Sequence, residues 1–125
     1  MLARALRSPL FGVTEGDRQI DELEVDVEEE CLKLLALFQP VAADLRFIVA
    51  VLKINNDLER VGDQAVNIAE RVMDIASHPK SGLNVDIPRM ATLATNMVHD
   101  ALQSLVTGNV DLARSVLERD DLVDA

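Results

Sequence analysis

The sequence contains no tryptophan, no tyrosine and only three phenylalanines among its 125 residues. Glycine and proline occur at only five and four positions, which leaves few residues for the many tight turns of an all-β fold. The apolar residues that make up 49% of the chain are therefore mainly Leu, Val, Ile, Ala and Met. These scarcities predict an all-α fold, and the length predicts a substantial buried core.

Basic residues are also few: 12 Lys and Arg stand against 22 Asp and Glu, for a formal net charge of −10. Nucleic-acid binding requires a basic surface, so no nucleic acid is expected as a partner. The single cysteine, Cys31, excludes an intrachain disulfide and predicts a small buried side chain. No apolar run reaches the roughly 18 residues that span a bilayer, and the N-terminal stretch is too short and broken for a signal peptide. A cytoplasmic chain that is not embedded in a membrane is expected.

Apolar residues recur at intervals of three and four along most of the chain, which is typical of helices with one buried face. The pattern predicts helices over about 17–39, 41–77 and 88–107, and a fourth helical stretch that continues to the C-terminus. Pro40 separates the first two, because proline lacks a backbone donor and disfavours helical geometry at Gln39. The turn-rich residues 80–87 predict a linker, and Gly108 and Asn109 should end the third helix.

The second helix is predicted to carry two neighbouring stripes. Its apolar stripe consists of Ile48, Leu52, Leu58, Val61, Ala65, Ile68 and Val72. A mixed seam beside it, counted by heptads, consists of Leu45, Val49, Leu52, Asn56, Glu59, Asp63, Val66 and Glu70. The acidic residues of the seam are expected to face the preceding helix across the turn at Pro40.

Two pairs of carboxylates have the spacing E/D-x-x-x-D: Asp17 with Asp21, and Glu59 with Asp63. Residues four apart lie on the same face of a helix. Asp21 and Glu59 are each 19 residues from Pro40, and Asp17 and Asp63 are each 23 residues from it. If the two helices fold back on each other at Pro40, all four carboxylates meet at one level of an antiparallel pair.

Four carboxylates in such proximity repel one another unless they share protons or bind a multivalent cation. Helical bundles build di-metal sites from inward-facing carboxylates, and oxygen ligands suit Mg²⁺, Ca²⁺, Mn²⁺ or Fe³⁺. A simpler alternative stays open, in which both pairs are solvated helix faces and Asp17 is an N-cap. Gly62 leaves room for a close neighbour or a hydrated ion, and a plain helix crossing explains it as well.

A short sequence pattern occurs twice in the chain and suggests an internal repeat. The pentapeptides DRQID (17–21) and DDLVD (120–124) share the pattern Asp-x-x-[Ile/Val]-Asp, and each follows a LAR tripeptide, at 2–4 and at 112–114. The same order in both places indicates a repeat protein seen from the middle of one repeat to the middle of the next.

The segment ALFQPVAADLRFIVAVLKINNDLERVGDQAVNIAERV (36–72) resembles the PhoU family. It carries the family's Leu-Arg-x-Ile-x-x-x-Leu-Lys-Ile, Asp-Leu-Glu-Arg-[Ile/Val]-Gly-Asp and Asn-Ile-Ala motifs. The resemblance implies repeats of an antiparallel three-helix bundle. It also implies a cytoplasmic negative regulator of phosphate uptake and of phosphate-starvation signalling, not an enzyme. Such a regulator would link the ATPase of a phosphate ABC transporter to a sensor histidine kinase.

The resemblance further implies metal clusters on the paired carboxylate motifs, with iron or Mg, Mn, Zn or Ca ions and no organic cofactor. Carried onto this chain, the ligands of the first repeat would be Asp17, Asp21, Glu59 and Asp63. Asp120 and Asp124 match the opening half of the second repeat's ligand set. Residues 1–79 would then be part of the first repeat and 88–125 the start of the second.

The chain departs from the family pattern in two respects. A full family member is nearly twice as long: here the first helix of the first repeat is absent or reduced to MLARAL, and the last helix of the second repeat is missing. In addition, SPLFGVTE (8–15) interrupts a segment that the family runs continuously. A second chain could supply the missing helix, and a homo-oligomer is therefore expected.

Two rival interpretations stay open. One is a metal-dependent bundle enzyme, which the absence of a Glu-x-x-His motif disfavours, since His78 falls in the turn-rich stretch 77–88 and His99 in the third helix, neither near the carboxylates by spacing. The other is a helical fragment that has lost its function.

Overall fold

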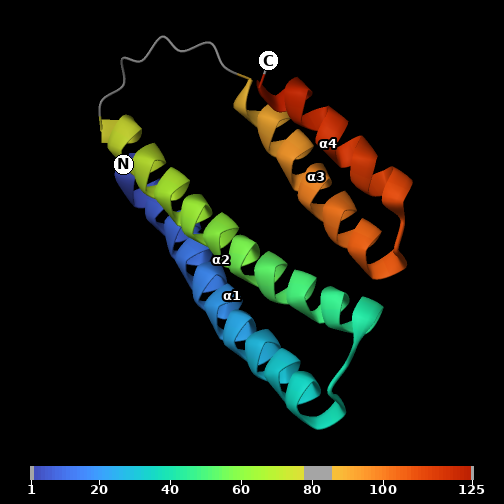
Figure 1. Ribbon diagram of the computed structural model, residues 1–125. Coiled ribbons are helices and arrows are strands. Elements are labelled where there is room, and N and C mark those ends of the chain that lie inside the picture. Colours follow the sequence, from blue (N-terminus) through green and yellow to red (C-terminus); the bar gives the residue numbers. More distant parts are fainter. Residues whose placement is uncertain (1, 78–85, 125) are drawn as a thin grey trace. The chain divides into compact units, whose positions relative to one another are not determined.

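The computed structural model describes residues 2–77 and 86–124. Within them every regular element is an α-helix, and the four are α1 (Leu2–Phe38), α2 (Ala42–Ser77), α3 (Ile87–Thr107) and α4 (Val110–Asp124). The predicted all-α class of antiparallel helices is confirmed (Figure 1). The chain divides into two compact units, Met1–Ser81 with α1 and α2, and Gly82–Ala125 with α3 and α4. The predicted linker at 80–87 lies, as far as residue 85, outside the described residues.

Helix α1 begins at Leu2, far ahead of the start predicted near residue 17, and that prediction was wrong. Pro9, Gly12 and Gly16 are weak helix formers and suggested a break. The backbone nevertheless continues as one helix through SPLFGVTE, with the antiparallel α2 beside it (Figure 1). Support from a neighbouring helix overrides local propensity. Asp17 is therefore an interior helix residue, which excludes the alternative in which it caps the start of the helix.

The turn between α1 and α2 forms where proline predicted it. Gln39 has a positive φ of 44°, in the left-handed region, so Pro40 does follow a residue with non-helical geometry. Ala42, at the start of α2, also has a positive φ, of 52°. Two non-glycine residues in this region make the turn tight, and the chain reverses direction within three residues.

The face of α2 that packs on α1 is a stripe of half-buried or buried residues. It consists of Ile48, Leu52, Asn55, Glu59, Gly62, Val66, Ala69, Met73 and Ala76. The predicted seam was correct at Leu52, Glu59 and Val66. Between them the inward-facing residues are Asn55 and Gly62, each one position before the predicted residue. Heptad counting alone does not distinguish between two such neighbouring positions. Asn55 anchors the contact, since its Nδ2 donates to the Glu24 carbonyl oxygen at 2.9 Å.

Part of the predicted apolar stripe of α2 faces away from α1. Val61, Ile68 and Val72 are 51%, 64% and 44% exposed. Among the described residues, Cys31 is the one buried apolar side chain, at 6% exposure, as expected for that cysteine. The predicted substantial core is therefore absent from these residues. Two helices bury only the stripe along which they touch, and each leaves its second apolar face open.

Helices α3 and α4 form a second antiparallel pair with well-defined ends. Asp86 caps α3 by accepting from the Arg89 backbone N–H at 3.1 Å, and Pro88 lies in the first turn. Gly108 ends α3 with φ 67°, a conformation that glycine adopts without strain. The Asn109 side chain then accepts from the Leu112 N–H at 3.0 Å and caps α4. None of the helices in the described parts of the chain combines the length and apolar character needed to cross a bilayer.

Candidate metal centre

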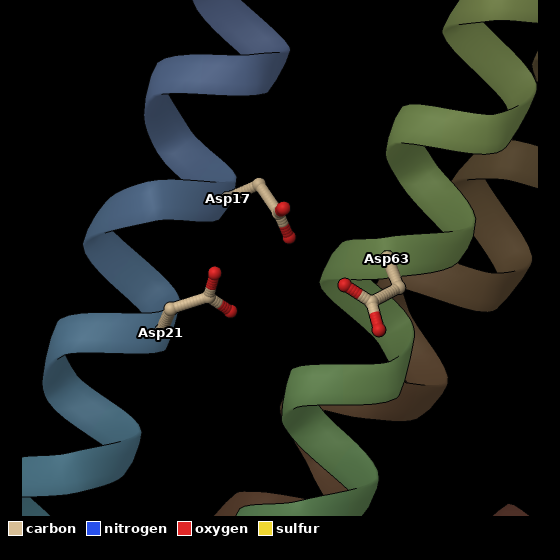
Figure 2. A group of neighbouring side chains, drawn as sticks. All are labelled: Asp17, Asp21 and Asp63. Carbon is tan, nitrogen blue, oxygen red and sulfur yellow. The ribbon is translucent and has the colours of Figure 1, made fainter.

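Five carboxylates from α1 and α2 gather at one level of the helix pair. Asp17, Asp21 and Asp63 each place an oxygen within 4.8 Å of the others (Figure 2). Asp21, Glu24 and Glu59 form a second group within the same limit, and Asp21 belongs to both. The predicted meeting of four carboxylates across the Pro40 turn is thus observed, and the solvated-face alternative no longer describes all of them, since Asp17 and Glu59 are half-buried.

Glu24 is a fifth member that the spacing argument missed. The E/D-x-x-x-D pattern joins carboxylates four residues apart, whereas Glu24 is three residues after Asp21. A three-residue step also keeps a side chain on the same helical face. Glu24 lies 16 residues before Pro40, as Asn56 lies 16 after it, so its level in the hairpin could have been read from the sequence.

Asp17 reaches deepest into the contact between the helices. Its Oδ1 is buried and has no hydrogen-bond partner among the described residues. This oxygen lies where a side chain at Gly62 would otherwise be, since a Cβ built on Gly62 would stand 2.7 Å from it. Burial raises the pKa of the Asp17 carboxyl, and the charges of Asp21 and Asp63 raise it further. An orphaned, desolvated carboxylate oxygen is costly unless a proton or a cation satisfies it.

Glu59, on α2, also has a raised pKa. A hydrogen bond with Asp63 raises the pKa of Glu59, and burial adds to this, followed by the charges of Asp63, Glu24 and Asp21. The raised pKa reflects the cost of holding like charges close together, a cost that a bound cation would relieve.

Basic side chains near the site do not neutralise it. Arg18, beside Asp17 in sequence, pairs with Glu15 and Glu22 on the outer face of α1. On α2, Arg60 pairs with Asp57 at 3.9 Å. None of the five clustered carboxylates forms an ion pair with a residue in the described ranges. The cluster is thus an uncompensated set of oxygen donors, which is the ligand chemistry of hard cations.

Comparison with known proteins places this arrangement in a family. The family model described as PhoU domain matches residues 11–72 and 87–125, which include most of both helix pairs and all five clustered carboxylates. The chain belongs to the PhoU family. The matched residues agree with the resemblance, which runs over about 17–72 and weakly over the rest of the chain.

Curated relatives carry the name phosphate-specific transport system accessory protein PhoU homolog. The one from Aquifex aeolicus is 46% identical over 90% of this chain and 51% of its own length. Those from Deinococcus radiodurans and Pseudomonas putida are each 39% identical, over 94% and 90% of this chain and 56% and 44% of their own lengths. The chain spans about half the length of the curated relatives it matches.

The second PhoU-type carboxylate pair, Asp120 and Asp124, lies on α4. Both residues are exposed, and neither joins a group of three potential ligands among the described residues. The structure thus places them four apart on one helix, as the spacing predicts, without bringing a third carboxylate to them.

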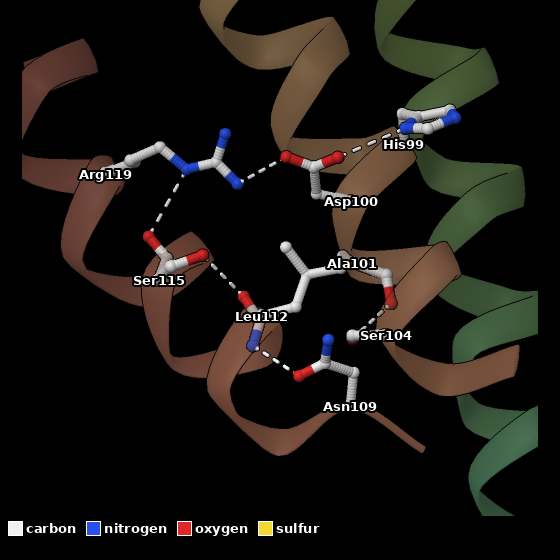
Figure 3. A network of polar contacts seen from close by, with 8 residues as sticks. All are labelled: His99, Asp100, Ala101, Ser104, Asn109, Leu112, Ser115 and Arg119. Carbon is white, nitrogen blue, oxygen red and sulfur yellow. Dashed lines mark hydrogen bonds and ion pairs between the residues drawn. The ribbon is translucent and has the colours of Figure 1, made fainter. Parts of the chain in front are cut away.

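The polar contact that joins α3 to α4 is instead an ion pair between Asp100 and Arg119. Arg119 Nη2 donates to Asp100 Oδ2 at 2.7 Å, and Arg119 Nε donates to the Ser115 carbonyl oxygen at 3.3 Å (Figure 3). His99 Nδ1 lies 3.2 Å from the other oxygen of Asp100. This network stabilises the contact between α3 and α4. Among the described residues it belongs to no group of potential metal ligands.

Replacing Asp100 with asparagine should remove an acid-sensitive part of the chain's stability. The hydrogen bond from Arg119 lowers the pKa of Asp100, and His99 lowers it further. A lowered pKa in the folded state gives stability above the unfolded pKa of about 4, which is lost as pH falls through the folded pKa. Thermal unfolding followed by circular dichroism should show a higher Tm for the parent than for D100N at pH 6, and this difference should shrink as the pH is lowered below about 4. A constant difference across this range would contradict the assignment.

Proposed function

We propose that the carboxylates of the α1–α2 pair hold one or more multivalent cations. Asp17, Asp21, Glu59 and Asp63 would be the ligands, with Glu24 completing the set beside Asp21. Iron and Mg²⁺, Mn²⁺, Zn²⁺ or Ca²⁺ are the candidate ions, and no organic cofactor is proposed. The support is the buried, unpartnered Oδ1 of Asp17 within the described residues and the absence of ion pairs to any of the five carboxylates there.

A bound cation would supply the positive charge that the site lacks and would tie α1 to α2. The chain's own residues hold the oxygens in place: Asn55 fixes the register at Glu24, and Gly62 admits Asp17. On the family resemblance alone, the proposal extends to Asp120 and Asp124 as half of a second ligand set.

We further infer that the chain acts in the cytoplasm as a negative regulator of phosphate uptake and of phosphate-starvation signalling. Its partners would be the ATPase of a phosphate transporter and a sensor histidine kinase. The observation that carries this proposal is the match of the PhoU domain to both helix pairs, together with relatives named as phosphate transport accessory proteins. Regulation by contact suits long helices whose outer faces carry exposed apolar residues.

A catalytic role is the less favoured alternative. The recess beside the carboxylates is lined by Glu24, Glu28, Leu52, Asn55 and Asn56. These residues offer oxygen and amide groups, but no histidine, cysteine, serine or lysine that would act as a nucleophile or as a base near neutral pH. We therefore propose that the chain is not an enzyme.

Binding to the transporter ATPase is the direct test of the regulatory role. The purified chain should bind the isolated phosphate-transporter ATPase, or the cytoplasmic part of the sensor kinase, in biolayer interferometry. The ATPase of an unrelated ABC transporter is the matched control and should give no signal. Binding to neither partner at concentrations of about 100 μM, where even weak contacts are detected, would favour a fragment without retained function.

Self-association is expected from the apolar faces that the helix pair leaves open. Val61, Ile68 and Val72 recur along one side of α2 and are 44–64% exposed. We propose that a second copy covers this side, as the homo-oligomer expected from the sequence. Light scattering after size exclusion should give twice the chain mass of 13.7 kDa, and Ile68→Glu should shift the chain toward monomer. A monomeric parent at micromolar concentration would contradict the proposal.

A further inference from the structure

We propose that Gly62 is a positioning residue of the carboxylate site: its missing side chain sets the place of the Asp17 carboxylate. This inference rests on the proposed cation site and adds to it a residue that carries no ligand atom. Gly62 lies in the interior of α2, where glycine is the poorest helix former after proline. A glycine kept at such a position needs a reason in its surroundings.

The reason is the close approach of two α1 side chains, Asp17 and Ile20, to the Gly62 backbone. Gly62 is one of only two buried residues among those whose burial is described in the α1–α2 pair, the other being Cys31. An ideal Cβ at Gly62 would lie 2.7 Å from Asp17 Oδ1 and 3.3 Å from Ile20 Cδ1. The first distance is shorter than any ordinary contact of a Cβ, and the second is tight. Both neighbours belong to α1, so the space is left for the opposing helix.

The two neighbours would respond differently to a side chain at position 62. Ile20 is a flexible apolar side chain at the edge of the contact, 36% exposed, and a small rotation removes its overlap. Asp17 has one methylene between its backbone and its carboxyl group, so moving Oδ1 away from position 62 shifts or turns the carboxylate that serves as the ligand. A methyl group at 62 therefore leaves the helices together but displaces one ligand from the cluster it forms with Asp21 and Asp63 (Figure 2).

Shape, not hydrogen bonding, holds Asp17 in this place. Within the described residues its Oδ1 is buried and unpartnered, so no donor fixes the carboxylate there. The space over the Gly62 backbone is what makes the position available. The sequence Glu-Arg-Val-Gly-Asp (59–63) thus combines two ligands with the gap that admits a third ligand from α1.

The chain offers matched controls for this proposal. Gly12 and Gly16 also lie inside a helix, α1, and a Cβ added at either would meet nothing within 4 Å. Gly12→Ala and Gly62→Ala therefore make the same chemical change, with the same gain in helix propensity. Only the second places a methyl group against Asp17.

Titration of the metal-free full chain with Mn²⁺, by calorimetry, should separate the two variants. Gly62→Ala should weaken Mn²⁺ binding about 10- to 100-fold, the usual effect of losing the support of a metal ligand, while Gly12→Ala should bind as the parent does. The Tm of metal-free Gly62→Ala should equal or exceed that of the parent, because alanine favours the helix. Parent-like affinity in Gly62→Ala would overturn the proposal.

Two double variants test whether the effect passes through Asp17. In an Asp17→Ala background, Gly62→Ala should cause no further loss of affinity, since the displaced ligand is already gone; an additive loss would contradict the proposal. Ile20→Ala/Gly62→Ala relieves the crowding at Ile20 and should bind Mn²⁺ as weakly as Gly62→Ala alone. Recovery of affinity in this variant would assign the effect to packing at Ile20 instead.

A crystal structure of metal-free Gly62→Ala distinguishes failure of this inference from failure of the cation site. If the parent binds no Mn²⁺, the proposed function fails, yet the Asp17 carboxylate should still be displaced from its position over residue 62. An Asp17 carboxylate that stays in place beside the added methyl group would overturn the positioning role, whether or not the parent binds cations.

Discussion

Replacing Glu59 and Asp63 together with alanine should reduce the metal content of the purified chain to background. Each of the two carboxylate groups contains one of these residues: Asp63 belongs with Asp17 and Asp21, and Glu59 with Asp21 and Glu24. The double variant therefore leaves each group with ligands from α1 alone. Oxygen sites for hard cations need several ligands from the protein, and three carboxylates on one helix cannot surround an ion.

The matched control removes two other carboxylates from the same helix. Asp57 and Glu70 are exposed on α2 and belong to neither group of potential ligands. Asp57→Ala/Glu70→Ala thus changes the net charge by the same amount without touching the cluster. Plasma emission analysis of the three proteins should find metal in the parent and in this control, and none in Glu59→Ala/Asp63→Ala. Equal metal content in all three would refute the proposed cation site.

The meeting of the carboxylates was predictable because a single turn determines it. Pro40 fixes where the chain reverses, and the four-residue spacing fixes which side chains share a face. Residues at equal distances from the turn must then approach one another, as Asp17 and Asp63 do. The same reasoning correctly placed the end of α3 at Gly108, where a positive φ requires a glycine or a similarly permissive residue.

The start of α1 and the extent of the core were not predictable by such local rules. Residues 2–16 are helical although Pro9, Gly12 and Gly16 weaken local propensity, and the partner that supports them, the second half of α2, is about 60 residues away in sequence. The core prediction failed because periodicity identifies an apolar face without saying whether a neighbour covers it. Ile68 fits the apolar stripe and is nevertheless 64% exposed.

The role of Gly62 also depends on a contact between helices. From the sequence, Gly62 fitted both a plain helix crossing and a space kept for a neighbour. The choice between them required the distance from Asp17 Oδ1 to the place of a Cβ. No pattern within α2 contains that information, because the neighbour is contributed by α1.

Removal of the cation should reverse the pH dependence of the chain's stability. Burial and neighbouring charges raise the pKa of Asp17, and the hydrogen bond with Asp63 and burial raise that of Glu59. A carboxyl whose pKa is raised by folding favours the folded state when protonated. Its contribution is fully present at low pH and is lost as pH rises through the unfolded value, about 4, toward the higher folded value. The metal-free chain should therefore gain Tm as pH falls from 7 toward about 4.

With saturating Mn²⁺ the Tm should instead fall as the pH is lowered. Binding to the folded state alone stabilises it, and at about 100 times the Kd the rise in Tm is on the order of 10 °C for a chain of this size. Protons compete with the cation for the same oxygens, so this gain should shrink as pH falls. Differential scanning fluorimetry at several pH values, with EDTA or with Mn²⁺, measures both slopes.

Glu59→Ala/Asp63→Ala decides whether the two slopes have one origin. This variant removes the Glu59 carboxyl and one of the two charges that raise the pKa of Asp17, whose burial remains, so the gain in acid should shrink and the Mn²⁺ stabilisation should disappear. If Mn²⁺ still raised its Tm, the cation would be bound elsewhere on this acidic chain. If only the acid gain changed, the cluster would be a set of proton-sharing carboxylates without a metal. A smaller acid gain together with loss of the Mn²⁺ stabilisation is the result that assigns repulsion and cation binding to the same five side chains.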